Sequence, residues 1–274
     1  MGLERLAAAA LEERRRALGR ELPRLARRGR GVEPVHRARV ACRRLRAVFS
    51  IFRGCFPGRA SKKWRREIRR LGRALGAARD ADVTISTLRG ALKLESDPAL
   101  RPGIRRLLLR ERRRRQALQA GVESALRRFK GAGLPGEMAL FTRAIGRRKR
   151  AGAAAVADEA RNKAREAGSA RLDALLGFAK AVRNPEQIEA LHRMRIAAKR
   201  LRYALEILAP ILDHDFKPAI AALKELQDRL GEIHDCDVWL ELLPGFLASE
   251  RGLMRRYLGH AGPMARIAPG IEAF

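Results

Sequence analysis

Residues 36–46 read HRARVACRRLR, and residues 192–202 read HRMRIAAKRLR, so one pattern occurs twice in the chain. A second pattern follows each copy: residues 75–83 read LGAARDADV, and residues 230–238 read LGEIHDCDV. Two different motifs that recur in the same order and at nearly the same spacing indicate a tandem duplication. The chain is therefore expected to fold as two similar units.

Each unit is expected to contain about four helices. These are a lead helix, the helix with the histidine and the arginines, a long third helix with the Asp-x-Asp-Val segment, and a return helix. The first unit covers about residues 1–131, the second about 137–274, and Gly131–Gly136 is the expected joint. Only about two dozen residues follow Arg251, so the second return helix is expected to be short or absent.

Helix-forming residues dominate the chain and predict an all-α fold. Ala, Leu, Arg and Glu fill long stretches in which apolar residues recur at i, i+3, i+4 and i+7, and β-branched runs are missing. Glycine and proline mark the expected helix ends. These breaks are Gly29–Gly31, Gly54–Gly58, Asp97–Gly103, Gly131–Gly136, Asn184-Pro185, Pro210, Pro218, Pro244-Gly245 and Gly262-Pro263.

The repeated helix separates basic from apolar side chains. Successive helical residues are rotated by ~100°, so His36, Arg39, Arg43 and Arg46 fall within roughly 80° of arc over about 15 Å of helix. The apolar residues gather on another face, which anchors the helix in a core. Stacked like charges repel, and a chain of phosphates along the stripe offsets that repulsion, because guanidinium forks suit phosphate oxygens. The second copy places His192, Arg195, Lys199 and Arg202 in the same way.

The charge of the chain is large and uneven. Sixty Lys and Arg residues face 30 Asp and Glu residues, a net charge of +30. Residues 1–150 carry 42 basic and 13 acidic side chains, whereas residues 151–274 carry 18 and 17. A polyanionic partner is indicated, and a generally basic background does not explain the second stripe. The surplus clusters are either solvated faces or extensions of the basic field: Arg65-Arg66, Arg69-Arg70, Arg112–Arg115 and Arg147–Arg150.

Two kinds of polyanion fit this charge, and the sequence favours one of them. Aromatic residues make up only 5% of the chain, which weakens recognition by base stacking. Helix-turn-helix, RRM and KH signatures are also missing from the sequence. Inorganic polyphosphate is therefore the preferred partner, and a non-specific nucleic-acid-binding protein is the alternative.

No catalytic residue and no cofactor are expected. P-loop, HExxH and GxSxG motifs are missing. The pairs Asp80/Asp82 and Asp235/Asp237 are two residues apart, so on a helix the two carboxylates face different directions and do not act on one atom. Pairing with arginines between helices is the expected role of these aspartates.

No metal site is expected at the histidines. His36 and His192 have cations at i+3 and i+7, which repel a metal ion, so hydrogen bonding to phosphate or to another helix is expected instead. His234 corresponds to Arg79 in the first copy, which makes it a poor candidate for a repeated function.

The three cysteines form neither a disulfide framework nor a zinc spacing. Cys42 lies in the apolar stripe and is expected to be a small core residue. The N-terminal alanine run is too short for a secretion signal, and no apolar window is long enough to span a membrane. A cytoplasmic protein is expected, and the sequence does not indicate its oligomeric state.

Together, His-x-x-Arg-Val/Ile-x-x-Arg/Lys-Arg-Leu-Arg and the following Leu-Gly-…-Asp-x-Asp-Val segment resemble the CHAD domain, the conserved histidine α-helical domain. The resemblance covers residues 1–274 as a single domain. It implies two helical bundles related by a pseudo-twofold axis, flanking a basic groove or pore, and binding of inorganic polyphosphate at polyphosphate granules. Lys199 departs from the arginine of the first copy and lacks its bidentate fork. The resemblance assigns phosphate binding to His36, Arg39, Arg43, Arg46, His192, Arg195, Lys199 and Arg202.

Overall fold

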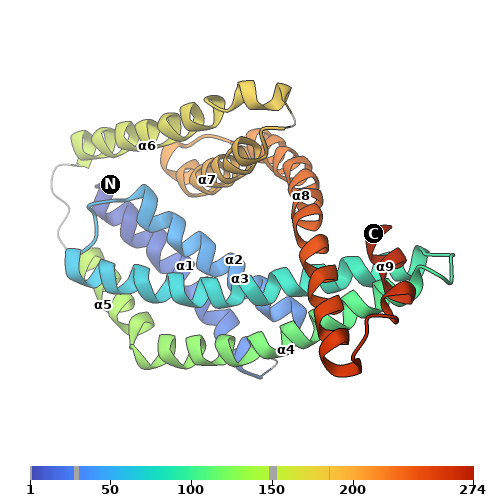
Figure 1. The fold of residues 1–274 in the computed structure, drawn as a ribbon. Helices are drawn as coiled ribbons and strands as arrows, with labels where there is room; N and C mark the ends of the chain where they lie inside the picture. The colour runs from blue at the N-terminus through green and yellow to red at the C-terminus, as the bar shows by residue number, and fades with distance from the viewer. Residues whose placement is uncertain (1, 28–30, 148–152, 185) are drawn as a thin grey trace.

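The computed structural model describes residues 2–27, 31–147, 153–184 and 186–274, and within these ranges all regular secondary structure is helical (Figure 1). The predicted all-α fold is thereby confirmed. The expected breaks at Gly29–Gly31 and Asn184-Pro185, and the basic run Arg147–Arg150, lie partly outside the described residues. The helices are α1 (Leu3–Arg27), α2 (Val32–Ile51), α3 (Gly58–Leu94), α4 (Arg101–Gly131), α5 (Leu134–Arg147), α6 (Ala153–Leu176), the 3-10 helix η1 (Ala179–Arg183), α7 (Ile188–Leu212), α8 (Lys217–Leu258) and α9 (Met264–Glu272).

The first hydrophobic core contains side chains from the five helices α1, α2, α3, α4 and α5. Leu11, Leu45, Leu71, Phe129 and Met138 contribute one buried side chain from each of these helices. On α2 the buried positions follow the helical period, and the small residues Ala38, Ala41 and Cys42 lie among them. Burial raises the pKa of the Cys42 thiol to about 12, so this cysteine is a neutral core residue, as predicted.

Helix α5 is an addition that the repeat did not predict. It begins at Leu134, inside the expected break Gly131–Gly136, and packs against α1, with Leu134 and Met138 buried in the first core. Trp64 Nε1 donates a hydrogen bond to Glu137 at 2.9 Å, which ties α5 to α3. The helices of the first core therefore extend to Arg147, and the division of the chain into two repeats stays a prediction.

The second core is smaller and joins α6, η1, α7 and α8. Leu175, Ala181, Leu201 and Leu230 represent these four elements in it. Figure 1 shows α6 lying along α7 at the side of the molecule opposite α4.

A third core connects the two halves. The C-terminal part of α3 and the N-terminal part of α4 pack against the C-terminal part of α8 and against α9. Their contacts involve Leu88, Leu107, Phe246 and Ile271. The carboxylate of Glu250, which is fully buried, forms ion pairs with Arg106 and Arg110 of α4. The C-terminal helix α9 is short, and it packs more extensively on α4 than on α8.

Two expected breaks are wrong, because Pro210 lies inside α7 and Pro244 lies inside α8. A proline removes one backbone hydrogen bond and strains the preceding turn. Tertiary contacts offset this cost in α8, because Leu243 and Phe246 pack into the third core beside Pro244. Pro210 lies close to the end of α7, where little helix remains to be disrupted.

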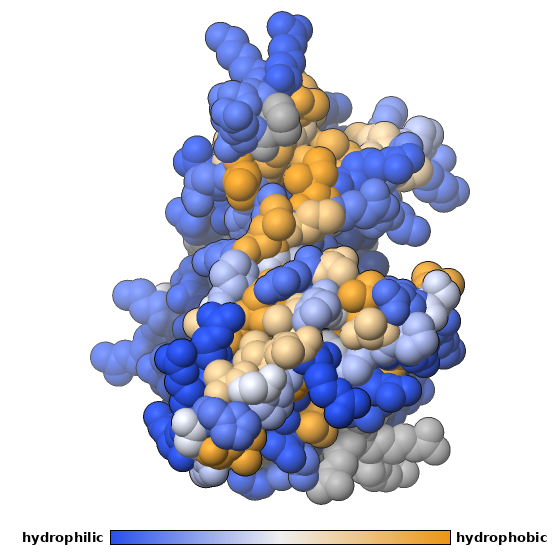
Figure 2. Space-filling view, turned by 45° about the vertical axis from the view of Figure 1, so that its right-hand side comes forward, coloured by the Kyte–Doolittle hydropathy of each residue, from blue (hydrophilic) through white to orange (hydrophobic). Residues whose placement is uncertain are grey.

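No helix within the described ranges is both long enough and apolar enough to cross a membrane. The face shown in Figure 2 is mainly hydrophilic, with hydrophobic side chains in patches between the charged ones. Along α8, Leu240, Tyr257 and Leu258 are exposed, whereas only five residues of this long helix are buried among those described. Helix α8 therefore packs on the second core through its N-terminal part and on the third core around Leu243 and Phe246, whereas its C-terminal end is exposed.

Candidate functional site

The two repeated helices, α2 and α7, contact each other, and Tyr203 lies at their interface. The guanidinium of Arg43 from α2 lies over the Tyr203 ring at 5.0 Å from its centroid, and that of Arg202 from α7 lies at 4.7 Å. Arg44 of α2 also forms an ion pair with Glu206 of α7 at 3.2 Å. Cation–π contacts from both helices hold one arginine of each stripe at this buried tyrosine.

Lys199 is surrounded by cations from both stripes. Burial and, after it, the neighbouring guanidiniums of Arg195, Arg43, Arg39 and Arg202 together lower the pKa of Lys199 to about 8. Two of these arginines belong to α2 and two to α7. The structure thus brings five of the eight predicted residues together in one basic cluster.

Two glycines make room for matching arginines. A Cβ atom on Gly76 of α3 would lie 3.6 Å from Arg39 Nε, and one on Gly231 of α8 would lie 3.2 Å from an Arg195 terminal nitrogen. Gly76 and Gly231 are the glycines of the two Leu-Gly motifs. In both copies, therefore, the glycine of the second repeated motif leaves space for an arginine of the first repeated motif.

Several polar atoms in this cluster have no hydrogen-bond partner. Arg43 Nε, Arg195 Nε and His192 Nδ1 are buried and find no partner within the described part of the chain. A buried donor without a partner is costly, and an anionic ligand would satisfy it. Arg202 differs, because its guanidinium donates to Glu206 at 3.0 Å, to Gln227 at 3.3 Å and to the Tyr203 hydroxyl at 3.1 Å.

The two histidines occupy one end of the stripes and have different neighbours. Burial and then the guanidinium of Arg79 on α3 lower the pKa of His36. His192 instead lies beside His234 of α8, with the ring centroids 4.6 Å apart. The sequence made His234 a poor candidate for a repeated function. The signal that could have identified it is its position in the second repeated motif, which is equivalent to that of Arg79 in the first copy.

Arg46 lies at the other end of the α2 stripe and is exposed. Partial burial and the guanidiniums of Arg69, Arg200 and Arg73 lower its pKa, while Cys42 has the opposite influence. The basic surface thus continues from α2 onto α3 and α7, and Arg69 belongs to a surplus cluster of the sequence. Arg69 therefore adds its charge to the basic field beside Arg46.

Other surplus arginines are structural. Arg66, Arg70 and Arg128 surround the buried carboxylate of Glu67 at 3.0–3.1 Å. Arg115 pairs with Asp82 at 2.8 Å, and both side chains are almost fully buried. The predicted role of the aspartates, pairing with arginines between helices, is confirmed for Asp82.

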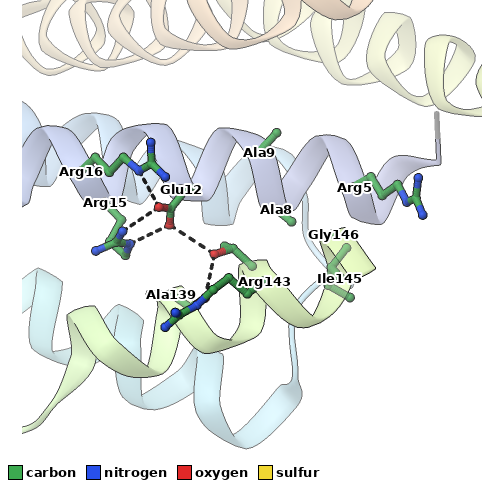
Figure 3. Close-up of a pocket in the computed structure, with 11 residues that line it drawn as sticks. Arg5, Ala8, Ala9, Glu12, Arg15, Arg16, Ala139, Arg143, Ile145 and Gly146 are labelled. Carbon is green, nitrogen blue, oxygen red and sulfur yellow. Dashed lines mark hydrogen bonds and ion pairs between the residues drawn. The ribbon is translucent and has the colours of Figure 1, made fainter. Parts of the chain in front are cut away.

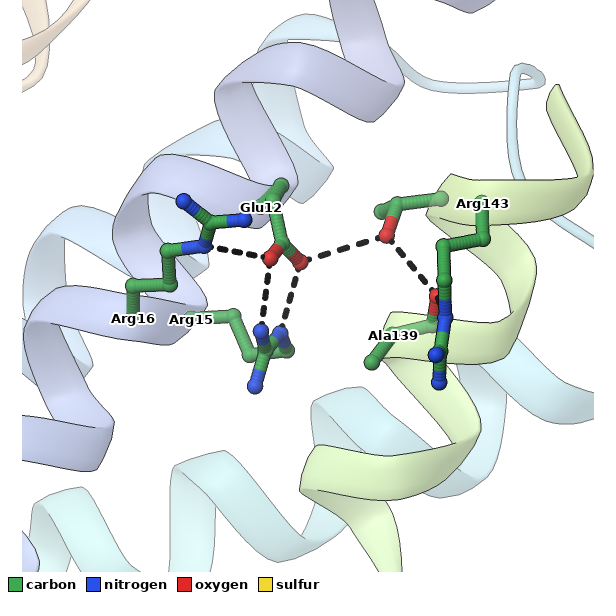
Figure 4. Close-up of polar contacts among 6 residues, drawn as sticks. Glu12, Arg15, Arg16, Ala139 and Arg143 are labelled. Carbon is green, nitrogen blue, oxygen red and sulfur yellow. Dashed lines mark hydrogen bonds and ion pairs between the residues drawn. The ribbon is translucent and has the colours of Figure 1, made fainter. Parts of the chain in front are cut away.

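A cavity of about 570 Å³ lies elsewhere, between α1 and α5 (Figure 3). Its polar wall is built around Glu12, which accepts hydrogen bonds from Arg15, Arg16 and Thr142 (Figure 4). These partners hold the pKa of Glu12 at about 2, against the opposing influence of burial. Two of the arginines in this cavity are therefore already paired with a carboxylate, unlike the buried nitrogens of Arg43 and Arg195.

Comparison with known proteins gives a family and a fold. The family model for the CHAD domain matches residues 9–244. The crystal structure of the CHAD domain from the plant Ricinus communis superposes with a TM-score of 0.66 at 23% sequence identity, covering 100% of this chain and 93% of the other. No curated protein matches the chain at a significant level.

Proposed function

Because this chain belongs to the CHAD domain family, we propose that it binds inorganic polyphosphate, without catalysing a reaction, through the basic faces of α2 and α7. The observation that carries the proposal is the cluster around Lys199, where cations from both helices converge with unpaired buried nitrogens. The proposal includes association with polyphosphate granules, where such chains are concentrated.

The recognition is electrostatic. A flexible chain of phosphates places one negative charge beside each cation in turn, which removes the repulsion within the cluster. Arg39, Arg43 and Arg195 would donate to phosphate oxygens, and Lys199 would act as a point charge between them. His36 and His192 would bind one end of the bound segment, and Arg46 and Arg202 the other.

The proposal also covers the arrangement of the two halves. The order α1–α4 would correspond to α6–α9, related by a pseudo-twofold axis near the contact of α2 with α7. Arg39 packs against Gly76 and Arg195 packs against Gly231, and these equivalent contacts support the correspondence. Each half would then contribute one stripe to a shared groove.

The test neutralises three cations of the cluster in one variant, Arg39→Gln, Arg195→Gln and Lys199→Gln. We expect a loss of at least about tenfold in polyphosphate affinity, and a salt dependence of log K that is flatter by about 2–3 units. Thermal stability should be unchanged or higher, because the substitutions remove repulsion between like charges.

The matched control removes the same net charge from α4, by Arg112→Gln, Arg113→Gln and Arg127→Gln, three exposed residues. This variant should bind nearly as well as the wild type. Equal losses in both variants would show that diffuse charge, and not the cluster, binds the polymer. Displacement of long-chain polyphosphate by duplex DNA at equal phosphate concentration would favour a nucleic-acid-binding protein instead.

A further inference from the structure

Position 79 on α3 and position 234 on α8 are equivalent in the two repeated motifs, but they hold different residues. Arg79 precedes Asp80 in LGAARDADV, and His234 precedes Asp235 in LGEIHDCDV. Arg79 lies one helical turn after Gly76, which packs against Arg39, and His234 lies one turn after Gly231, which packs against Arg195. In the first half Arg79 lowers the pKa of His36, and in the second half His192 contributes to lowering the pKa of His234.

In the second half the contact is between two imidazoles. The rings of His192 and His234 are 4.6 Å apart, and both side chains are half-buried. His192 Nδ1 is buried and has no hydrogen-bond partner within the described ranges, so His234 does not satisfy it. A pair of adjacent imidazoles with an unsatisfied nitrogen is suited to an anionic oxygen that hydrogen-bonds to both rings.

In the first half, the position equivalent to His234 holds Arg79, which is always charged. Arg79 is close enough to His36 for its charge to lower the pKa of that histidine, together with Arg43 and Arg39, while Glu33 has the opposite influence. An arginine stays charged at every physiological pH, whereas a histidine changes its charge near pH 6–7. The half of the site that contains Arg79 and the half that contains His234 therefore respond differently to acid.

We propose that Arg79 and His234 are further phosphate-binding residues, and that His234 makes the second half of the site bind polyphosphate more tightly in mild acid. This inference rests on the proposed function and adds a residue pair and a regulation to the same site. His234 gains positive charge as the pH falls, and a phosphate bound beside His192 and His234 stabilises that charge.

The charges around His234 define the sign of the effect. Burial, His192 and Arg195 of α7 lower its pKa, whereas Asp235 and Asp237 of its own helix have the opposite influence. On the α2 side, Arg39 and Arg43 add positive charge to the cluster around Lys199. His234 is thus neutral at pH 7.5 in the free protein, and a polyanion raises its pKa, so that a proton is taken up on binding.

The experiment measures the affinity for long-chain polyphosphate at constant ionic strength from pH 7.5 to pH 5.5. Internal phosphates of a long chain keep their charge in this range, so the change reports on the protein. The wild type should bind several-fold more tightly at pH 5.5, because a shift of about one pKa unit on binding gives the full tenfold only below the pKa values of both the free and the bound protein.

Two substitutions at His234 distinguish charge from structure. His234→Gln should bind more weakly than the wild type at pH 7.5, because a hydrogen bond to phosphate is lost, and it should also lose most of the gain in affinity at pH 5.5. His234→Arg should bind more tightly at pH 7.5 and gain less from acid. The reciprocal variant Arg79→His should bind more weakly at pH 7.5 and gain more from acid, while His214→Gln, an exposed histidine outside the cluster, is the control.

Wild-type affinity of His234→Gln at pH 5.5, with polyphosphate still bound, would overturn this inference and leave the proposed function intact. An unchanged affinity of both His234→Arg and Arg79→His at pH 7.5 would do the same. A wild type that binds no polyphosphate at any of these pH values would instead overturn the proposed function.

Discussion

At the scale of single residues, Lys199 has a charge that depends on its neighbours. Its pKa of about 8 follows from burial and from the four guanidiniums around it. We predict that polyphosphate affinity falls as the pH rises from 7 to 9.5, because above pH 8 binding requires the uptake of a proton. Titration calorimetry in buffers of different ionisation enthalpy measures both the affinity and this uptake.

The variant Lys199→Arg keeps its charge throughout this range and should show a flat profile. The same pKa affects the free protein. A lysine whose pKa is lower in the folded than in the unfolded state makes the free energy of unfolding rise with pH between about 8 and 10.5. A wild-type affinity that is constant from pH 7 to 9.5 would contradict the role of Lys199.

Asp80 and Asp82 are two residues apart and have different roles. Asp82 is buried with Arg115, whereas Asp80 is 65% exposed and lies 3.5 Å from Arg39. We predict that Asp82→Ala lowers the free energy of unfolding by about 3 kcal/mol, because it leaves a buried guanidinium without its partner. Asp80→Ala should cost less than about 1 kcal/mol.

Chemical denaturation of both variants measures these changes. Asp80→Ala should also strengthen polyphosphate binding, because it removes the carboxylate nearest to Arg39. Equal destabilisation by the two substitutions would contradict the assignment of Asp82 as the structural member of the pair.

At the scale of helices, glycines determine how closely α4 and α9 approach. A Cβ atom on Gly270 would lie 1.7 Å from the carbonyl oxygen of Leu100, and one on Gly103 would lie 2.3 Å from that of Ile267. Backbone atoms do not move aside as side chains do. We predict that Gly270→Ala destabilises the protein by at least about 2 kcal/mol, because α9 must move away from α4.

Thermal unfolding measures this loss, and hydrogen exchange of residues 264–272 locates it. Gly252→Ala is the matched control, because it adds the same methyl group inside α8 with no atom within 4 Å. It should stabilise the protein by about 0.5–1 kcal/mol through helix propensity. Similar effects of the two substitutions would mean that α9 does not depend on this close approach.

The helices themselves were largely predictable from the sequence. The apolar period and the repeated motifs located α2, α3, α7 and the N-terminal part of α8. Helix α5 was missed because it has no counterpart in the repeat. Pro210 and Pro244 were misjudged because proline punctuation is a local signal, whereas the contacts that stabilise the end of α8 come from distant residues of α3 and α4.

At the scale of the whole molecule, the net charge of +30 opposes folding, and a bound polyanion relieves it. We predict that long-chain polyphosphate raises the melting temperature strongly at about 20 mM salt and little at about 500 mM, because salt screens the attraction. Scanning fluorimetry across this salt range measures the effect.

The triple variant at Arg39, Arg195 and Lys199 is the comparison for this measurement. It should lose most of the shift at low salt, whereas the α4 control should keep it. A shift of the same size in wild type and triple variant would show that polyphosphate acts through the charge of the molecule as a whole.

The sequence by itself determined the helical class and the CHAD family, and it predicted the duplication and the eight candidate residues, because each is recorded in local patterns of apolar and charged residues. Tertiary structure alone decided which charges are already paired. Arg66, Arg115 and Arg128 have buried carboxylate partners, whereas Arg43, Arg195 and Lys199 lie among other cations with no ion-pair partner within the described ranges. Pairing depends on residues far apart in the chain, and so does the position of His234 beside His192.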